Sequence, residues 1–105
     1  MQRGEIWWAD LSRPAGRRPV LLLSRDDAYA VRQFIIMSPL TTRSRSLRTE
    51  VNLGSEVGLS RSAVANLDVI ITEPKVCLLE RIGSLSPDQL QAVDKAIHFA
   101  LGLIE

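Results

Sequence analysis

The segment that decides the fold reads RRPVLLLSRDD and spans residues 17–27. The four consecutive apolar residues at 20–23 are too few for a helix but suit a β-strand with both faces buried. Pro19 has no N–H to donate to a β-ladder, so we expect it to be the first residue of this strand. Arg17 and Arg18 then lie side by side at the entrance to a rigid strand. There they either hold an anion or simply flank the strand.

The length and composition are those of one globular domain, residues 1–105. Hydrophobic residues make up 46% of the chain, but the apolar runs at 20–23 and 34–37 are far shorter than the roughly 20 residues of a membrane span. The N-terminus lacks the pattern of a signal peptide. Cys77 is the only cysteine, which excludes a disulfide framework. We therefore predict a cytoplasmic protein without membrane contact.

The net charge of +1 is unevenly distributed along the chain. Residues 1–48 carry nine arginines against four acids, whereas residues 49–105 carry four basic residues against eight acids. Arginine suits bidentate phosphate contacts and stacking on bases. The basic half is consistent with a nucleic-acid partner and equally with a solvated surface.

Short strand-like segments separated by turn residues fill most of the chain, at 6–11, 33–38, 48–53, 62–67, 69–72 and 76–83. We expect Pro39 to end the second of these segments, and 40–47 to be a loop. An amphipathic helix follows, because Ser86 and Gln89 form a capping box and Pro87 takes the first helical position. Its apolar stripe is Leu90, Val93, Ile97, Leu101 and Ile104, with Gly102 as terminator. This order predicts a mainly β fold, a small barrel-like antiparallel sheet with a C-terminal helix.

The residues that usually carry metal or covalent chemistry are scarce. The single His98 lies on the flank of the helix, and Cys77 lies in an apolar run, so together they make no zinc site. Asp26 and Asp27 point apart on an extended chain, and no phosphate-binding glycine loop or nucleophile motif is present. We expect no metal and no cofactor.

Arginine and hydroxyl side chains can still stabilise a phosphate in a reaction. A guanidinium neutralises the charge that develops on the phosphate oxygens, and a hydroxyl donates a further hydrogen bond. If the substrate is RNA, its own 2′-hydroxyl is the nucleophile, and the protein needs to supply positioning, charge and proton handling. Arg17 or Arg18 with Thr41 or Thr42 would meet this need if the turn before one strand and the loop after another converge.

The chain also resembles a known family along nearly its whole length. The motifs are RGEIWWADL at 3–11, GRRPVLLL at 16–23 and SPLTT at 38–42, followed by 62–75 and by ERIGSLS at 80–86. Their order is similar to that of the MazF/PemK toxin endoribonucleases. The resemblance implies an SH3-like barrel of the CcdB/PemK superfamily with a helical extension, a homodimer, and metal-independent cleavage of single-stranded RNA that leaves 2′,3′-cyclic phosphate and 5′-hydroxyl ends. It also implies a cognate antitoxin whose acidic tail covers the RNA groove.

Carried over residue by residue, the resemblance places the catalytic arginine at Arg18 and the catalytic hydroxyl at Thr41. Further RNA contacts are expected from nearby basic and hydroxyl residues, namely Arg17, Thr42, Arg43, Arg45 and Arg48. Two features depart from the family pattern. The loop at 12–17 has no glutamate to serve as a base, and Val69 and Ile71 replace a polar Gln and Arg.

Two other functions are compatible with this fold. One is a non-enzymatic poison of gyrase, as in toxins that share the barrel, although such a protein has no need of the Arg18 and Thr41 pair. The other is an inactive RNA- or partner-binding module, which the substitutions at Val69 and Ile71 would suit.

Overall fold

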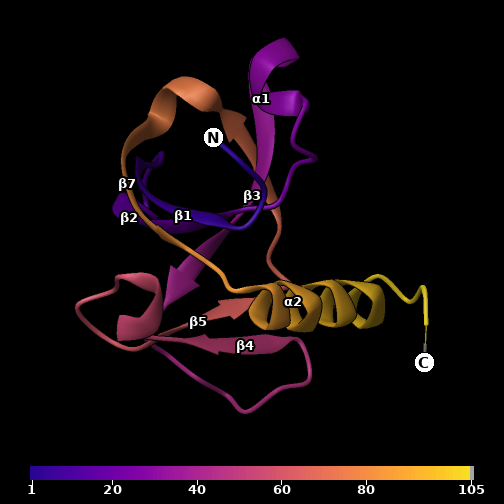
Figure 1. Cartoon of the computed structure of the whole chain (residues 1–105). Helices are drawn as coiled ribbons and strands as arrows, with labels where there is room; N and C mark the ends of the chain where they lie inside the picture. The colour runs from indigo at the N-terminus through magenta and orange to yellow at the C-terminus, as the bar shows by residue number, and fades with distance from the viewer. Residues whose placement is uncertain (105) are drawn as a thin grey trace.

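The computed structural model describes residues 1–104 as a strongly curled antiparallel sheet with one long helix packed on it (Figure 1). The elements in chain order are β1 (Glu5–Asp10), β2 (Arg17–Leu22), α1 (Ala28–Val31), β3 (Phe34–Thr41), β4 (Glu50–Leu53), η1 (Ser55–Val57), β5 (Ala63–Asn66), β6 (Ile71–Pro74), η2 (Lys75–Cys77), β7 (Leu78–Ser84) and α2 (Pro87–Ala100). Here η marks a 3₁₀ turn. The prediction of a mainly β, barrel-like sheet with a C-terminal helix is confirmed.

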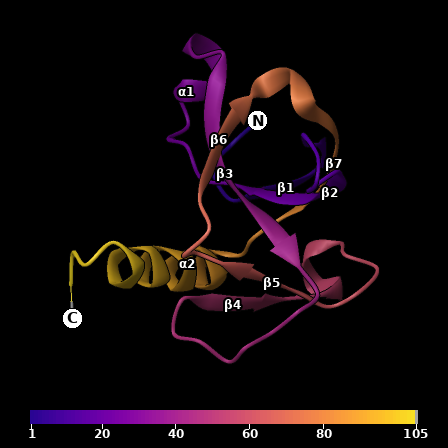
Figure 2. The same cartoon turned by 180° about the vertical axis from the view of Figure 1, so that it is seen from behind.

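The strands run in the order β4-β5-β3-β2-β1-β7, and β6 pairs with the first half of β3. β3 therefore has two partners on one side: β6 along Phe34–Met37, then β5 at Leu40 and Thr41. Figure 2 shows how this long strand leaves the upper barrel and reaches the β4–β5 hairpin. That hairpin supports α2. No helix in the described part of the chain is long and apolar enough to cross a membrane.

The end of β2 and Leu23, which follows it, are buried on both faces, as the four apolar residues at 20–23 predicted. Leu21 and Leu23 belong to the core cluster beneath α2, together with Val93. Val20 and Leu22 point the other way, into a second cluster inside the barrel. Each such side chain contributes about 1.5–3 kcal/mol through burial, so β2 holds the two halves of the molecule together.

Pro19 and Pro39 lie inside strands, whereas we expected Pro19 to begin its strand and Pro39 to end its strand. Pro19 is the third residue of β2, and Pro39 is followed by two more residues of β3. Leu23 donates its N–H to the carbonyl of Ile36 in β3. Because backbone N–H groups alternate along a strand, the nitrogen of Pro19 also faces β3. It lies beyond Val20, the last residue of β2 that pairs with β3. The nitrogen of Pro39 faces away from β2, into the gap between β6 and β5. Neither missing N–H removes a ladder hydrogen bond, and the loop predicted from residue 40 begins at Thr42.

The C-terminal helix begins as predicted and ends earlier. Ser86 Oγ accepts the N–H of Gln89 at 3.2 Å, the Gln89 side chain accepts the N–H of Ser86 at 2.8 Å, and Pro87 is the first helical residue. The helix ends at Ala100, and Gly102 follows with a φ of +71°. Leu101 and Ile104 of the predicted stripe therefore lie outside the helix and are exposed.

Candidate active site

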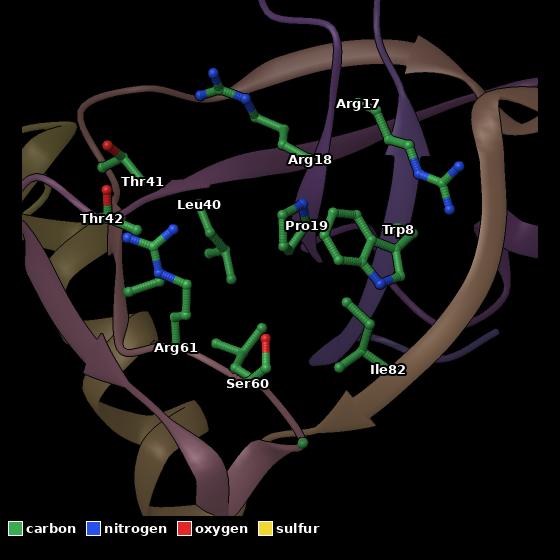
Figure 3. Close-up of a pocket in the computed structure, with 13 residues that line it drawn as sticks. Trp8, Arg17, Arg18, Pro19, Leu40, Thr41, Thr42, Ser60, Arg61 and Ile82 are labelled. Carbon is green, nitrogen blue, oxygen red and sulfur yellow. The ribbon is translucent and has the colours of Figure 1, made fainter.

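The residues at the start of β2 and the end of β3 meet in one pocket of about 380 Å³. Its lining also includes the connection from η1 to β5 and part of β7. Figure 3 shows Arg18 extending to the side of the pocket where Thr41 and Thr42 lie. The turn before one strand and the end of another thus converge, as the proposed chemistry requires.

Arg18 is held in place by its own turn. Its Nε donates to the carbonyl of Ala15 at 3.2 Å, and its side chain is half-buried. No described residue accepts a hydrogen bond from its two terminal nitrogens, and none forms an ion pair with it. The geometry fixes the stem of the side chain and leaves the fork available for an anion.

Thr41 is oriented by the loop that follows it. Its Oγ1 accepts the backbone N–H of Arg43 at 3.2 Å. Because that contact uses a lone pair of the oxygen, the hydroxyl proton stays available to donate into the pocket.

Arg17 lies in the same pocket but points away from Thr41 (Figure 3). Its guanidinium carbon lies 5.5 Å from the ring centroid of Trp8, within the range of a cation–π contact. Trp8 is half-buried and forms one wall of the pocket with Pro19 and Ile82.

Sequence reasoning missed Arg61, which also lines the pocket and points toward Thr42 (Figure 3). It follows η1 in the short polar run Ser60-Arg61-Ser62, which resembles in composition the Thr, Arg and Ser segment after β3. That similarity in composition was the sequence signal that could have identified Arg61. With Arg17 and Arg18 it gives the pocket three guanidinium groups, whereas the 13 lining residues include no Asp, Glu, His, Cys or Lys.

Three of the expected RNA contacts lie on the 42–49 loop and do not line this pocket. Arg43 acts on the site through its backbone N–H, as described for Thr41. Arg45 is exposed, and the guanidinium of Arg48 lies 3.9 Å from the ring centroid of Phe99 on α2. As RNA contacts, these three residues stay predictions.

Glu50 holds the 42–49 loop in shape. Its carboxylate accepts the hydroxyl of Ser44 at 3.1 Å and the backbone N–H of Arg45 at 3.0 and 3.1 Å. Burial acts to raise the pKa of Glu50, but these hydrogen bonds outweigh it and lower the pKa below its ordinary value. The charged form of Glu50 is therefore the form that this loop favours.

The remaining titratable residues form no metal site among residues 1–104. Asp27 pairs with Arg25, and Asp26 accepts the backbone N–H of Arg3. His98 is exposed on α2. Cys77 is half-buried, and burial raises the pKa of its thiol, which disfavours the reactive thiolate.

Comparison with known proteins shows the family of this chain. Residues 2–101 match the family described as the PemK-like, MazF-like toxin of type II toxin–antitoxin systems. The chain belongs to this family. It is 39% identical over 101 residues to the probable endoribonuclease MazF5 of Mycobacterium tuberculosis, covering 94% of this chain and 91% of that protein.

Solved structures of family members have the same fold. The Mycobacterium tuberculosis toxin MazF-mt6 superposes with a TM-score of 0.88 at 33% identity, covering 96% of this chain and 99% of that one. An endoribonuclease in complex with its cognate antitoxin from a mycobacterial species superposes with a TM-score of 0.87 at 28% identity, covering 100% and 98%.

Proposed function

We propose that this MazF-like chain is an endoribonuclease toxin that cuts single-stranded RNA at a short sequence motif. The observation that carries the proposal is the pocket itself, in which Arg18 and Thr41 lie together and whose lining contains three guanidinium groups and no carboxylate. A site of this charge suits a phosphodiester. The activity that the name MazF5 records for a 39% identical relative supports the same conclusion.

In the proposed reaction the 2′-hydroxyl of the RNA attacks the adjacent phosphorus. A bond forms between the 2′ oxygen and phosphorus, and the bond from phosphorus to the 5′ oxygen breaks. The terminal nitrogens of Arg18 and the hydroxyl of Thr41 bind the phosphate oxygens as negative charge develops on them. The products are a 2′,3′-cyclic phosphate and a 5′-hydroxyl.

Proton transfer in this scheme uses the solvent. The described residues that line the pocket include no Asp, Glu, His, Cys or Lys to act as a general acid or base. We infer that water takes the proton of the 2′-hydroxyl and that the 5′ oxygen takes a proton from water. The loop at 12–17, which has no glutamate, is consistent with this scheme.

The antitoxin is proposed to carry acidic residues that cover the same pocket. The three arginines of a pocket lining that contains no carboxylate form a surface that attracts an acidic peptide as well as RNA. The solved complex of a related endoribonuclease with its cognate antitoxin supports such a partner.

The homodimer is proposed to form through the outer face of β3 and β6. Phe34 and Ile36 are 52% and 43% exposed, and they alternate along β3 opposite Pro74 and Thr72 of β6, so both point to one face of the sheet. Exposed apolar side chains gathered on one face are typical of a protein interface. Phe34→Asp should give a smaller particle than the wild type in analytical ultracentrifugation, and an unchanged sedimentation coefficient would exclude this face.

One experiment tests the proposed activity. The purified chain is incubated with single-stranded RNA in the presence of EDTA, and the new 5′ ends are labelled directly with polynucleotide kinase. We expect discrete fragments with 5′-hydroxyl ends and no effect of EDTA. Uncut RNA together with induction of DNA damage in cells would indicate the gyrase poison. Binding without cutting would indicate the inactive module.

A further inference from the structure

A second pocket of about 360 Å³ adjoins the first and shares Thr42 and Ala63 with it. Its other lining residues are Ser44, Asn52, Leu53, Gly54, Glu56, Ser62 and Val64. The charges of the two pockets are opposite in kind. The first contains three arginines and no acid, whereas the second contains one carboxylate, several uncharged polar groups and no basic residue. A phosphate therefore favours the first pocket and is repelled by the second.

Sheet register places Asn52 in line with Thr41. Val64 of β5 lies opposite Thr41 on one side and opposite Asn52 on the other. Residues that are directly opposite one another point to the same face of a sheet, so the three form a row across β3, β5 and β4. Two strand spacings separate Thr41 from Asn52, which is roughly 10 Å. A nucleotide next to the scissile phosphate spans such a distance.

Asn52 and Glu56 can both bind the edge of a base. The amide of Asn52 offers a donor and an acceptor side by side, and the residue is exposed. Glu56 is fixed through Oε1, which accepts the N–H of Gly54 at 3.0 Å and the Nε2 of Gln89 at 3.1 Å. Its Oε2 accepts no hydrogen bond from residues 1–104, so this oxygen is available to a ligand.

The rim of the second pocket is ordered by the loop already described. Ser44 lines the pocket, and its hydroxyl donates to Glu50 at 3.1 Å. The same carboxylate binds two further loop N–H groups. The second pocket is therefore held in shape before any ligand binds, which reduces the entropy lost on binding.

We propose that the second pocket is a nucleobase subsite that sets part of the cleavage motif, a proposal that rests on the proposed RNA cleavage. It takes a base with an exocyclic amine, that is adenine, cytosine or guanine in preference to uracil. The amine donates to Glu56 Oε2, and Asn52 pairs with the neighbouring groups of the same base edge. Uracil has the carbonyl oxygen O4 where cytosine has its amine, and this oxygen faces the carboxylate unfavourably.

The first arm of the test compares cleavage motifs. An RNA pool with a short randomised stretch is cut by the wild type, Asn52→Ala, Glu56→Gln and Gln91→Ala, and the cut ends are sequenced. Gln91→Ala is the matched control, because it removes an exposed amide on α2 away from both pockets. We expect the wild type to disfavour uracil at one position beside the cut. Asn52→Ala and Glu56→Gln should reduce that discrimination about tenfold, at that position alone.

The second arm does not depend on cleavage. Fluorescence anisotropy measures the binding of 2′-O-methylated oligo(A), oligo(C) and oligo(U), which lack the nucleophile. The wild type and Gln91→Ala should bind oligo(A) and oligo(C) more tightly than oligo(U), and the two subsite variants should lose the difference. If the wild type cuts no RNA, the proposed function is wrong. The binding measurements still test whether the second pocket is a nucleobase subsite. A preference for uracil, or motifs and binding ratios unchanged in both subsite variants, would overturn the proposal.

Discussion

The hydroxyl oxygen of Thr41 accepts the backbone N–H of Arg43 at 3.2 Å. This contact fixes the oxygen at the end of β3 and leaves its proton available to a ligand in the pocket that Arg18 enters from β2. The loop after β3 thus orients a candidate catalytic group by a main-chain contact, which requires a hydroxyl at position 41.

The first prediction concerns that hydroxyl. Thr41→Val keeps the shape of the side chain but removes both the acceptor for Arg43 and the proton donated to the phosphate. Loss of one such donor lowers kcat by about 10²- to 10³-fold in other enzymes, and we expect a loss of that order. Thr41→Ser retains the hydroxyl and should stay within about tenfold of the wild type. Single-turnover cleavage of an end-labelled RNA measures both rates, and equal rates for Val and Ser would remove the hydroxyl from the mechanism.

The second prediction separates the two neighbouring arginines. Arg18→Lys keeps a positive charge but loses the Nε contact with Ala15 and the planar fork, so cleavage should fall at least about tenfold. Arg17→Lys keeps a charge over Trp8 and should have a much smaller effect on the rate. Circular dichroism and thermal unfolding would confirm that both variants fold. An Arg17 variant as impaired as the Arg18 variant would contradict the assignment of the phosphate clamp to Arg18 alone.

Local sequence signals were sufficient for some elements and insufficient for others. The capping box at Ser86 and the apolar run of β2 depend on neighbouring residues alone, and both were predicted correctly. The positions of Pro19 and Pro39 within strands depend on where partner strands stop, which is information from distant parts of the chain. The same limit applies to Arg61, because only the close packing of η1 against β7 brings its loop to the pocket.

The third prediction concerns acid and the 42–49 loop. The pKa of Glu50 in the folded protein is lower than its ordinary value of 4.5. A depressed carboxyl pKa stabilises the fold above the ordinary value, and this contribution is lost as the pH falls through the lower folded value. Glu50→Gln should therefore lower the melting temperature at pH 7, and the difference from the wild type should shrink below about pH 4.5. Thermal unfolding followed by circular dichroism between pH 7 and pH 3 measures this difference, and a constant difference across the range would contradict it.

The last prediction concerns the contact between η1 and β7, which we expect to position the part of the pocket lining that contains Arg61. A Cβ on Gly83 of β7 would lie 2.0 Å from the carbonyl oxygen of Val57 and 2.8 Å from its carbon, both backbone atoms of η1. Gly83→Ala must therefore move η1 and β7 apart, and the pocket wall changes with them, because Gly58 to Arg61 follow η1 and Ile82 of β7 also lines the pocket. We expect a loss of stability of about 1–3 kcal/mol, together with weaker RNA binding.

The control is Gly102→Ala, whose Cβ meets no atom within 4 Å at a φ of +71° and which should cost only about 1 kcal/mol of backbone strain. Urea unfolding and RNA-binding isotherms on both variants measure the effects. Because η1 contacts the barrel through β7, an alanine at 83 without effect on RNA binding would show that the position of Arg61 does not depend on this contact.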